Sequence, residues 1–378
     1  MAQSAKVKLL TRPWPILLLV RKLDHGGCER DLSKIALGLD RSMFEPHVGC
    51  FLPEGIRVAE LREAGIPIVH LPVTSFKSPS AIRGAMILRR YMRQHRIELV
   101  HAFDVPLSLF AGLLARWCGA RAVITAQLAY RGLSSPMDRR LLRMVDRMAD
   151  RVVVNCEAMS RHMVEDEGLR PERAYLCYNG VDTAVFHPGP GERPEPLRDA
   201  TLIIGTIANL RPEKGLHLLL EAFAAVRRPG MKLLIVGSGP SLEELQARSR
   251  ELAIADDCLF LPGKPQIASE MRAIDVFVLP SLSEAFSNAL LEAMASGCAV
   301  IGSNLGGTPE LIRDGKTGLL FRPGDSQDLA EKLRYLIEHD DLRRKFGCEA
   351  ASFTHATFPI SRTVSRMTDL YQSLLESL

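Results

Sequence analysis

Two glutamates, Glu284 and Glu292, stand near the two ends of a mostly apolar stretch, 281-SLSEAFSNALLEAMASG-297. Residues 288–295 are good helix formers, and Gly297 follows them, so a short helix is predicted here. That helix is apolar on almost every side and is therefore expected to be buried. A buried carboxylate is costly unless something hydrogen-bonds to it. Glu292 therefore needs a partner, supplied either by the protein or by a ligand.

Two basic residues, Arg211 and Lys214, lie in 205-GTIANLRPEKG-215, between a predicted strand and a predicted helix at 216–223. Basic side chains beside the positive N-terminus of a helix form a site suited to phosphate groups. The plainer alternative is a solvated loop in which Gly215 permits a tight turn. Residues 283–288, which lead into the helix of Glu292, offer backbone N–H groups for a second anion site.

Candidate site residues also occur in the first half of the chain. Gly26 and Gly27, in 26-GGCER-30, follow the first predicted strand and permit close approach of the backbone to a ligand. His101 and Asp104 end another strand, which predicts that they lie at the rim of a cleft. A histidine there is suited to proton transfer near neutral pH, although a hydrogen-bonded structural histidine is the alternative.

Composition limits the class of protein. The 378 residues suit two domains, and 47% hydrophobic and 24% charged residues are ordinary globular values. A formal charge of +4 gives no reason to expect nucleic acid as a partner. The eight cysteines are scattered without a CxxC pair, which favours buried thiols in a reducing cytosol over disulfides or a zinc site. No apolar run is long enough to span a membrane, and residues 16–20 suit a first strand better than a signal peptide.

The order of elements predicts an α/β fold. Short apolar runs alternate with helical patterns, which is typical of parallel sheets covered on both faces. The strand-length runs are 16–20, 47–52, 97–103, 121–127, 151–156, 202–209, 231–237, 258–263, 275–281 and 298–304. A Pro/Gly-rich linker, 188–200, divides two Rossmann-like domains that face each other across a cleft. We expect domains at 1–188 and 200–358, and a C-terminal helix at 359–378 that crosses back to the first domain.

Seven ordered segments resemble the nucleotide-sugar-dependent glycosyltransferases of family 4, which have the two-domain GT-B fold. The segments are 26-GGCER-30, 101-HAFD-104, 179-NGVDTAVF-186, 208-ANLRPEKG-215, 284-EAFSNALLE-292, 306-GGTPELI-312 and 314-DGKTGLLF-321. The Glu-x7-Glu element formed by Glu284 and Glu292, with its apolar helix, is the most specific of these features. The resemblance covers nearly the whole chain.

The resemblance implies a role for each matched residue. Arg211 and Lys214 would hold the diphosphate of the donor, Glu284 would bind hydroxyls of the donor sugar, and Glu292 would bind the ribose. The other implied donor-binding residues are Gly26, Gly27, Asn209, Gly237, Gly263, Phe286, Ser287 and Asn288. Asp104 and Gln127 are candidate sugar contacts, and His101 is a further catalytic candidate. The implied donor is a UDP- or GDP-linked sugar, transferred with retention and without a metal or other cofactor.

The sequence departs from the family pattern at two positions. Gln127 stands where many relatives have a histidine, and glutamine can form hydrogen bonds but does not titrate. Asn209 stands where relatives often have an arginine, and Arg211 is expected to take over part of that work.

The sequence is compatible with two other classes of function. The alternatives are a non-catalytic sugar-nucleotide-binding component of a glycan assembly complex and a dinucleotide-dependent oxidoreductase. The loop 237-GSGPSL-242 has Leu242 where a third glycine would complete a dinucleotide fingerprint, which argues against the latter. The expected acceptor is a glycan or a lipid-linked molecule, and the expected location is the cytoplasm. The arginine-rich stretches 83–96 and 139–147 suit solvated helix faces, or a peripheral contact with an anionic membrane.

Overall fold

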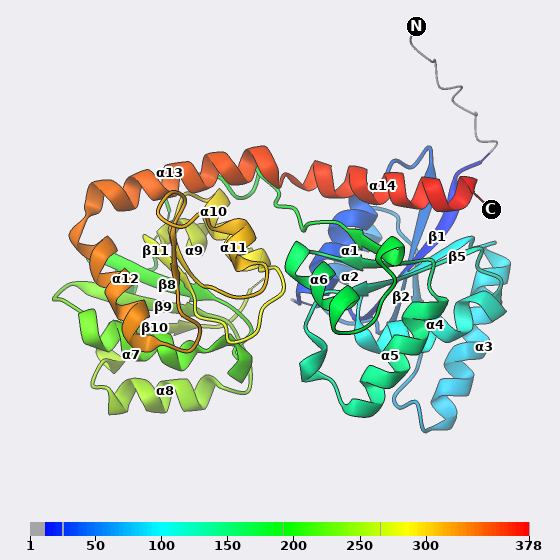
Figure 1. Ribbon diagram of the computed structural model, residues 1–378, viewed down its shortest axis with the longest axis horizontal. Helices are drawn as coiled ribbons and strands as arrows, with labels where there is room; N and C mark the ends of the chain where they lie inside the picture. The colour runs from blue at the N-terminus through cyan, green and yellow to red at the C-terminus, as the bar shows by residue number, and fades with distance from the viewer. Residues whose placement is uncertain (1–11, 25, 192, 265, 378) are drawn as a thin grey trace, which may run out of the picture.

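The computed structural model describes residues 12–24, 26–191, 193–264 and 266–377. Residues 1–11 of the expected first domain and Leu378 of the expected last helix lie outside the described residues. The chain forms two lobes, each built on a parallel sheet with helices on both faces (Figure 1). The strand order is β3-β2-β1-β4-β5-β6-β7 in the first sheet and β10-β9-β8-β11-β12-β13 in the second. The predicted fold class is confirmed.

Most strands are buried along nearly their whole length, as parallel strands covered on both faces should be, whereas the edge strands β7 and β10 are half-buried. In the first sheet they are β1 (Trp14–Lys22), β2 (Phe44–Leu52), β3 (Ile68–His70), β4 (Leu99–Ala102), β5 (Ala122–Gln127), β6 (Arg151–Val154) and β7 (Ala174–Leu176). In the second they are β8 (Leu202–Ile207), β9 (Met231–Val236), β10 (Cys258–Leu261), β11 (Val276–Leu279), β12 (Ala299–Ser303) and β13 (Leu319–Phe321).

Helices connect most successive strands, which gives the crossover connections that parallel sheets need. In the first lobe they are α1 (Gly27–Gly38), α2 (Arg57–Glu63), α3 (Pro79–Gln94), α4 (Val105–Cys118), α5 (Pro136–Met148) and α6 (Glu157–Glu165). In the second they are α7 (Leu216–Val226), α8 (Leu242–Glu251), α9 (Ala268–Ala273), α10 (Asn288–Ala295), α11 (Thr308–Leu311), α12 (Ser326–Glu338) and α13 (Asp340–Thr357), and α14 (Ile360–Glu376) ends the chain.

The ten strand-length runs all correspond to strands of the two sheets, but three strands were missed. β3, β7 and β13 have three residues each and lie at sheet edges. Such a strand is too short to show a hydrophobic period, and an edge position needs less apolar cover. The predicted helix at 288–295 matches α10, with Gly297 at φ +83° just beyond it.

Helices α13 and α14 run along one side of both lobes (Figure 1). A bridge between Val181 and Pro359 marks the point where the chain passes from the second lobe back to the first. On α14, Met367 and Tyr371 are buried in the apolar cluster of the first lobe, where the Tyr371 ring lies 6.0 Å from that of Phe44. The helix that crosses back is therefore observed. The domain limits at 188 and 200 remain a proposal, placed between Leu176 of β7 and Leu202 of β8.

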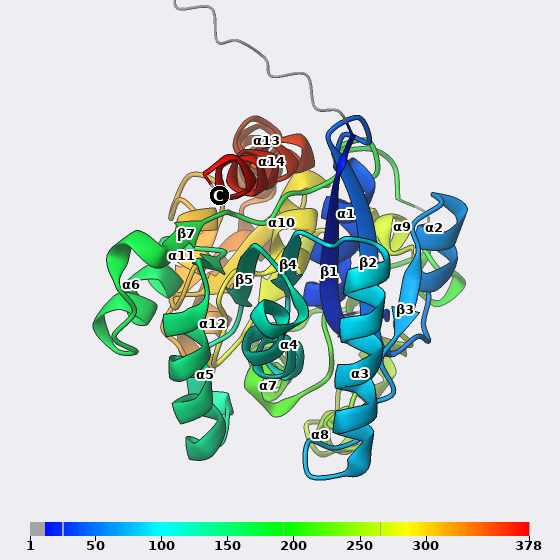
Figure 2. The same cartoon turned by 90° about the vertical axis from the view of Figure 1, so that its right-hand side faces the viewer.

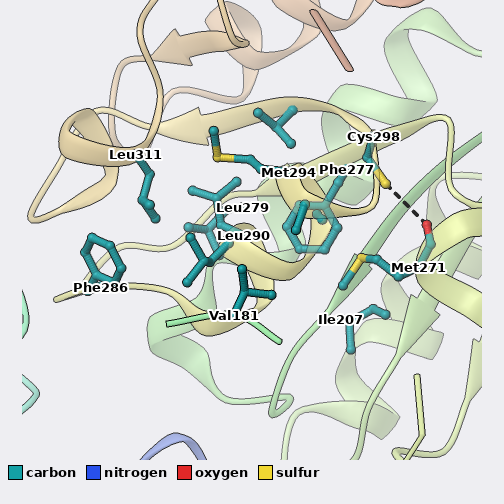
Figure 3. Packing of buried hydrophobic residues seen from close by; sticks show 14 of the residues in the cluster. Val181, Ile207, Met271, Phe277, Leu279, Phe286, Leu290, Met294, Cys298 and Leu311 are labelled. Atoms are coloured by element: carbon teal, nitrogen blue, oxygen red, sulfur yellow. Dashed lines mark hydrogen bonds between the residues drawn. The ribbon is translucent and has the colours of Figure 1, made fainter. Parts of the chain in front are cut away.

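An apolar cluster joins the two lobes beneath the cleft. It contains Val154 and Met159 from the first lobe together with Phe286 and Leu290 from the second. Figure 3 shows part of this cluster, including Val181, where α10 packs against β11 and Cys298 donates to the backbone oxygen of Met271 at 3.2 Å. The lobes are thus joined by continuous packing as well as by the chain.

Among the described residues, no helix combines the length and the apolar character that crossing a bilayer would require.

Candidate functional site

A cavity of about 370 Å³ lies between the two lobes. In each sheet the order of strands reverses beside one central pair, β1 and β4 in the first sheet and β8 and β11 in the second. Ligands of open α/β sheets bind where strand order reverses, beyond the carboxyl ends of the strands. The loops after β1, β8 and β11 all reach this cavity. Its volume lies within the usual range for small-molecule sites.

Most of the residues predicted for the donor site line this cavity. They are Gly27, Asn209, Arg211, Lys214, Gly237, Gly263, Glu284, Phe286, Ser287 and Asn288. These residues come from five separate segments of the chain, so the fold brings them together from positions far apart in the sequence.

Lys214 and Glu284 form an ion pair at the cavity. The Lys214 ammonium donates to the Glu284 carboxylate at 2.7 Å, and the Ser281 hydroxyl donates to the same oxygen at 3.1 Å. Both side chains are only partly exposed, at 23% and 11%. Arg211 is freer, since its side chain is 59% exposed and its guanidinium is 3.9 Å from Glu213. The loop after β8 thus presents two of the cations that line the cavity, and one of them is held in place by a carboxylate.

Gly215 fixes the loop that carries Lys214. Its φ of +60° lies in the left-handed region, and a Cβ there would stand 2.2 Å from the carbonyl oxygen of Pro280. The loop after β8 is thus pressed directly against the loop after β11, which carries Glu284. This contact explains why Lys214 and Glu284 meet although they are far apart in the chain.

The N-terminus of α10 faces the first lobe. Ser287 caps the helix, accepting from the N–H of Leu290 at 3.3 Å, and the Asn288 side chain donates to Asp31 of α1 at 3.0 Å. A Cβ on Gly27 would lie 3.7 Å from the Asn288 amide nitrogen. The two lobes therefore approach closely where residues 286–288 line the cavity, and the N-terminus of a helix favours an anionic ligand.

Glu292 obtains a partner from the protein itself. The Arg30 guanidinium of α1 donates to Glu292 Oε1 across the lobe boundary, while Glu292 is 1% exposed. This pairing raises the pKa of Arg30, chiefly through the Glu292 charge. Glu292 Oε2 has no hydrogen-bond partner among the described residues, and Glu292 does not line the cavity. One of its oxygens is thus satisfied by Arg30 and the other is left for a further donor.

Other charged groups surround this pair. Lys34 donates to the backbone oxygen of Gly180 at 2.8 Å, and burial lowers its pKa. Burial raises the pKa of Asp31, the carboxylate that accepts from Asn288. Sequence reasoning did not single out Arg30 and Asp31 by role, although 26-GGCER-30 marked the start of α1. Their position at the first turn of a helix that follows a central strand was the available signal.

His101 does not lie at the cleft rim, contrary to expectation. It is fully buried, its Nδ1 is 2.8 Å from the Tyr371 hydroxyl of α14, and its ring stacks 4.1 Å from that of Phe103. Burial lowers the pKa of His101 to about 3. It therefore stays neutral near pH 7, and its side chain is directed from β4 into the core beneath α14. This environment is that of a hydrogen-bonded structural histidine, which was the alternative to a role in proton transfer.

Asp104 also has structural partners. It caps α4 by accepting from the N–H of Leu107 at 2.9 Å, and it accepts from the N–H of Arg21 at 2.5 Å. Burial raises the pKa of Asp104 to about 6. Asp104 does not line the cavity. Gly26, the N-cap residue of α1, is likewise outside its lining, whereas the neighbouring Gly27 belongs to it.

Gln127 is held by a buried network beside the cavity. Its side-chain oxygen accepts from Arg131 Nε at 2.9 Å, and its amide donates to the backbone oxygen of Ala129. Arg131 is 1% exposed and also pairs with Asp146 and Glu167. Gln127 itself does not line the cavity, but the next three residues, 128–130, do. The network thus shapes the loop that follows β5.

Several cavity residues were missed by sequence reasoning. They include Asn155, Asn179, Ser238, Lys264 and Tyr130. Asn155 directly follows β6, and its Oδ1 is buried without a hydrogen-bond partner among the described residues. A polar residue at the carboxyl end of a strand was the signal that could have identified it. Asn179 stood in a segment quoted for its family resemblance, without a role.

Comparisons with known proteins agree with this architecture. Residues 25–185 match the model of Glycosyltransferase Family 4, and residues 192–353 match that of Glycosyl transferases group 1. Together the two matches extend over nearly all of the two lobes. The chain belongs to the family 4 glycosyltransferases and has the GT-B fold.

Two curated relatives and one solved structure illustrate the match. The D-inositol 3-phosphate glycosyltransferase of Mycobacteroides abscessus is 34% identical over 59% of this chain and 52% of its own length. The N-acetyl-alpha-D-glucosaminyl L-malate synthase of Bacillus anthracis is 28% identical over 75% of this chain and 76% of its own. The structure of Anabaena HepE with UDP and glucose superposes with a TM-score of 0.84 at 22% identity, covering 95% of this chain and 99% of HepE.

The chain spans about half the length of the first of these relatives. It spans 62% of the length of a second D-inositol 3-phosphate glycosyltransferase, from Nocardia farcinica. These relatives are named for different molecules, D-inositol 3-phosphate in one case and L-malate in the other. Family membership thus defines the class of enzyme and the fold.

Proposed function

We propose that this protein is a retaining glycosyltransferase that moves a sugar from a nucleoside diphosphate donor to a hydroxyl of a glycan or lipid-linked acceptor. The observation that carries the proposal is the Lys214–Glu284 pair at the cavity between the lobes. A diphosphate needs cations, and a sugar needs hydrogen-bond acceptors for its hydroxyls. This pair offers one of each side by side.

Charge stabilisation is the main catalytic contribution that we assign to the site. As the bond between the anomeric carbon and the phosphate oxygen lengthens, negative charge builds up on the diphosphate. Lys214, Arg211 and the N–H groups at the start of α10 would stabilise that charge. In this proposal the protein supplies the stabilisation itself, and no metal ion is required.

Retention follows from attack on the face that the diphosphate leaves. The acceptor oxygen forms its bond to the anomeric carbon of an oxocarbenium-like sugar as the bond to the phosphate oxygen breaks. The proton of the acceptor hydroxyl passes to the departing phosphate oxygen. Glu284 would hold sugar hydroxyls during this step, so it is assigned a binding role.

Glu292 is assigned to the ribose through its unpartnered Oε2, with Arg30 occupying Oε1. A ribose hydroxyl would satisfy the remaining oxygen of this buried carboxylate. Because Glu292 does not line the cavity, this assignment requires a small opening between α10 and α1. Domain movements around a bound donor are a common way to complete such sites.

UDP is the donor nucleotide that we favour, because HepE, with the same fold, was crystallised with UDP and with UDP-glucose. GDP-linked donors remain the alternative. We place the reaction in the cytoplasm, since all eight cysteines are free thiols and most are buried.

The test is turnover. Purified protein is incubated with UDP-glucose, UDP-galactose, UDP-N-acetylglucosamine and GDP-mannose, and release of the nucleoside diphosphate is measured with and without EDTA. We expect slow hydrolysis of one donor, unchanged by EDTA and lost in Lys214→Met and Glu284→Gln. Tight nucleotide binding without release from any donor, including in the presence of candidate acceptors, would favour the non-catalytic binding component.

A further inference from the structure

Helices α3, α4 and α5 form a surface that the proposed reaction does not use. They cover the face of the first sheet opposite α14, with α3 and α5 on either side of α4 (Figure 2). The Arg89 guanidinium of α3 lies 4.1 Å from the ring centroid of Trp117 on α4, and Gly112 of α4 packs against Val145 of α5. The three helices thus form one continuous layer.

Exposed apolar side chains are concentrated on this layer. Of the twelve large hydrophobic residues exposed among the described residues, eight belong to α3, α4, α5 or the loop before α3. They are Phe76, Ile82, Met86, Leu113, Trp117, Met137, Met144 and Met148. Trp117 is 56% exposed and Met137 66%. Scattered exposed apolar residues need no explanation, but such a concentration marks an interaction surface.

Apolar and basic residues share the outward side of each helix. On α3, Ile82, Met86, Arg90 and Arg93 follow a helical spacing of three or four residues. On α5 the same spacing connects Met137, Arg140, Met144 and Arg147, and on α4 it connects Leu113 with Arg116 and Trp117. Each outward stripe therefore combines side chains that can enter an apolar phase with cations beside them.

The charge on the layer is almost entirely positive. The three helices contain nine arginines and two acidic residues, Asp138 and the buried Asp146. Five arginines, namely Arg83, Arg90, Arg93, Arg140 and Arg147, form no ion pair with any carboxylate of the described residues. α3 and α4 contain no acidic residue at all. Nothing within this layer neutralises these cations.

We propose that the α3–α4–α5 layer docks on an anionic phospholipid membrane. Basic residues attract the headgroups of anionic lipids, and tryptophan, methionine and leucine side chains enter the boundary between headgroups and acyl chains. A second copy of the same layer is disfavoured because like charges would face each other. Nucleic acid would use the arginines but would leave the exposed Ile82, Met86, Met137 and Met144 without a function.

The docking itself is independent of the proposed reaction. Its consequence for function rests on that proposal. Residues 128–130 line the cavity, and the chain continues from them through a short 3-10 helix, Arg131–Leu133, into α5. A lobe held on the bilayer by α5 would keep the cavity close to the membrane surface. A lipid-linked acceptor would then be presented at the site.

The test is co-sedimentation with large unilamellar vesicles at low and high salt. One set is phosphatidylcholine alone, and the other contains phosphatidylglycerol. The test variant carries Arg83→Gln, Arg90→Gln, Arg93→Gln, Arg140→Gln and Arg147→Gln. The matched control removes five second-lobe cations that likewise pair with no carboxylate in the part of the chain that the structure describes. Its substitutions are Arg198→Gln, Arg250→Gln, Lys316→Gln, Arg334→Gln and Lys345→Gln.

We expect the wild-type protein and the control to bind phosphatidylglycerol vesicles at least about tenfold more tightly than phosphatidylcholine vesicles. High salt should weaken this binding, and the test variant should lose it. In a Trp14→Phe background, vesicles should shift the emission of Trp117 to shorter wavelength. Equal binding by the test variant, an unchanged Trp117 spectrum, or binding to RNA with none to vesicles would overturn the proposal.

Nucleoside diphosphate binding, measured on the same proteins, separates this proposal from the proposed function. None of the five arginines lines the cavity, so the test variant should bind nucleotide like the wild type. Loss of vesicle binding with unchanged nucleotide binding supports docking. Vesicle binding by a protein that binds no nucleotide would support docking and contradict the proposed function.

Discussion

Lys214 carries more of the proposed chemistry than any other single residue. Its ammonium group donates to the Glu284 carboxylate, and the Ser281 hydroxyl donates to the same carboxylate oxygen. The cation is therefore positioned before any ligand binds. A positioned charge stabilises a transition state better than one that must first reorganise. Arg211 is more exposed and has only a distant carboxylate, so we expect it to contribute less.

Replacing Lys214 by methionine should lower donor cleavage roughly a hundredfold or more, because one preorganised charge is lost from the leaving group. Release of the nucleoside diphosphate measures this effect. Lys316→Met, at an exposed position of the second lobe, is the control and should keep the wild-type rate. An equal rate in Lys214→Met would show that the ammonium does not act on the diphosphate.

Removing Glu292 should destabilise the protein by about 3 kcal/mol, because Arg30 would keep a charge without its partner at the lobe boundary. Urea denaturation of Glu292→Ala measures the loss. The double variant Arg30→Met, Glu292→Leu should recover much of it, since both charges are then absent. If Glu292→Ala were as stable as the wild type, the ion pair would have no structural role, and the carboxylate would serve a ligand alone.

At the scale of elements, the strands and the principal helices could be predicted, whereas their contacts across the chain could not. The apolar runs predicted ten of the thirteen strands. Lys214, Glu284 and Gly27 were predicted as site residues because they lie in loops that follow predicted strands. Partners such as Arg30 for Glu292, or Tyr371 for His101, are 262 and 270 residues away. The spacing of residues within one short segment cannot predict pairs that are so far apart in the sequence. His101 was misplaced because its position at a strand end does not say which face of the sheet its side chain occupies.

The loop after β5 depends on a buried arginine. Arg131 binds Gln127, Asp146 and Glu167 while being 1% exposed. Arg131→Met should cost about 3–5 kcal/mol in stability, because the buried Asp146 carboxylate loses its cation, whereas Glu167 keeps Arg139 and Arg143. Chemical denaturation checks this value. Exposed Arg140, on the following helix, is the control, and Arg140→Met should change stability little.

The attachment of α14 to β4 should weaken in acid. Burial lowers the pKa of His101 to about 3 in the folded state, whereas an unfolded histidine has a value near 6.5. The unfolded chain therefore binds more protons, so stability is complete above about pH 6.5 and is lost as the pH falls towards about 3. The expected loss is about 1.4 kcal/mol for each pH unit within that range.

His101→Gln is the comparison for this effect, since glutamine can bond to the Tyr371 hydroxyl but does not titrate in this range. The difference in free energy of unfolding between wild type and variant, measured from pH 7 to pH 4, should shrink as the pH falls. Parallel pH profiles for the two proteins would show that His101 is not the group responsible.

At the scale of the whole molecule, polar contacts between the lobes hold them together. Arg30 of the first lobe donates to Glu292 of the second, and Asn288 of the second donates to Asp31 of the first. The Glu310 carboxylate accepts from the first N–H groups of α6 and from the Tyr178 hydroxyl at 2.8 Å. Residues of both lobes line the cavity, so a donor bound there would touch both lobes at once. Donor binding should therefore stabilise the molecule as a unit.

The most direct measurement is the melting temperature with UDP, GDP, ADP, CMP and NAD⁺, taken for the wild type, Lys214→Met and the control Lys316→Met. A ligand that binds only the folded state raises the melting temperature in proportion to the logarithm of its concentration relative to its dissociation constant. We predict stabilisation by one nucleoside diphosphate, with UDP favoured, equal in the control and lost in Lys214→Met. Stabilisation by NAD⁺ alone, or an equal response of Lys214→Met, would contradict a donor site built on Lys214.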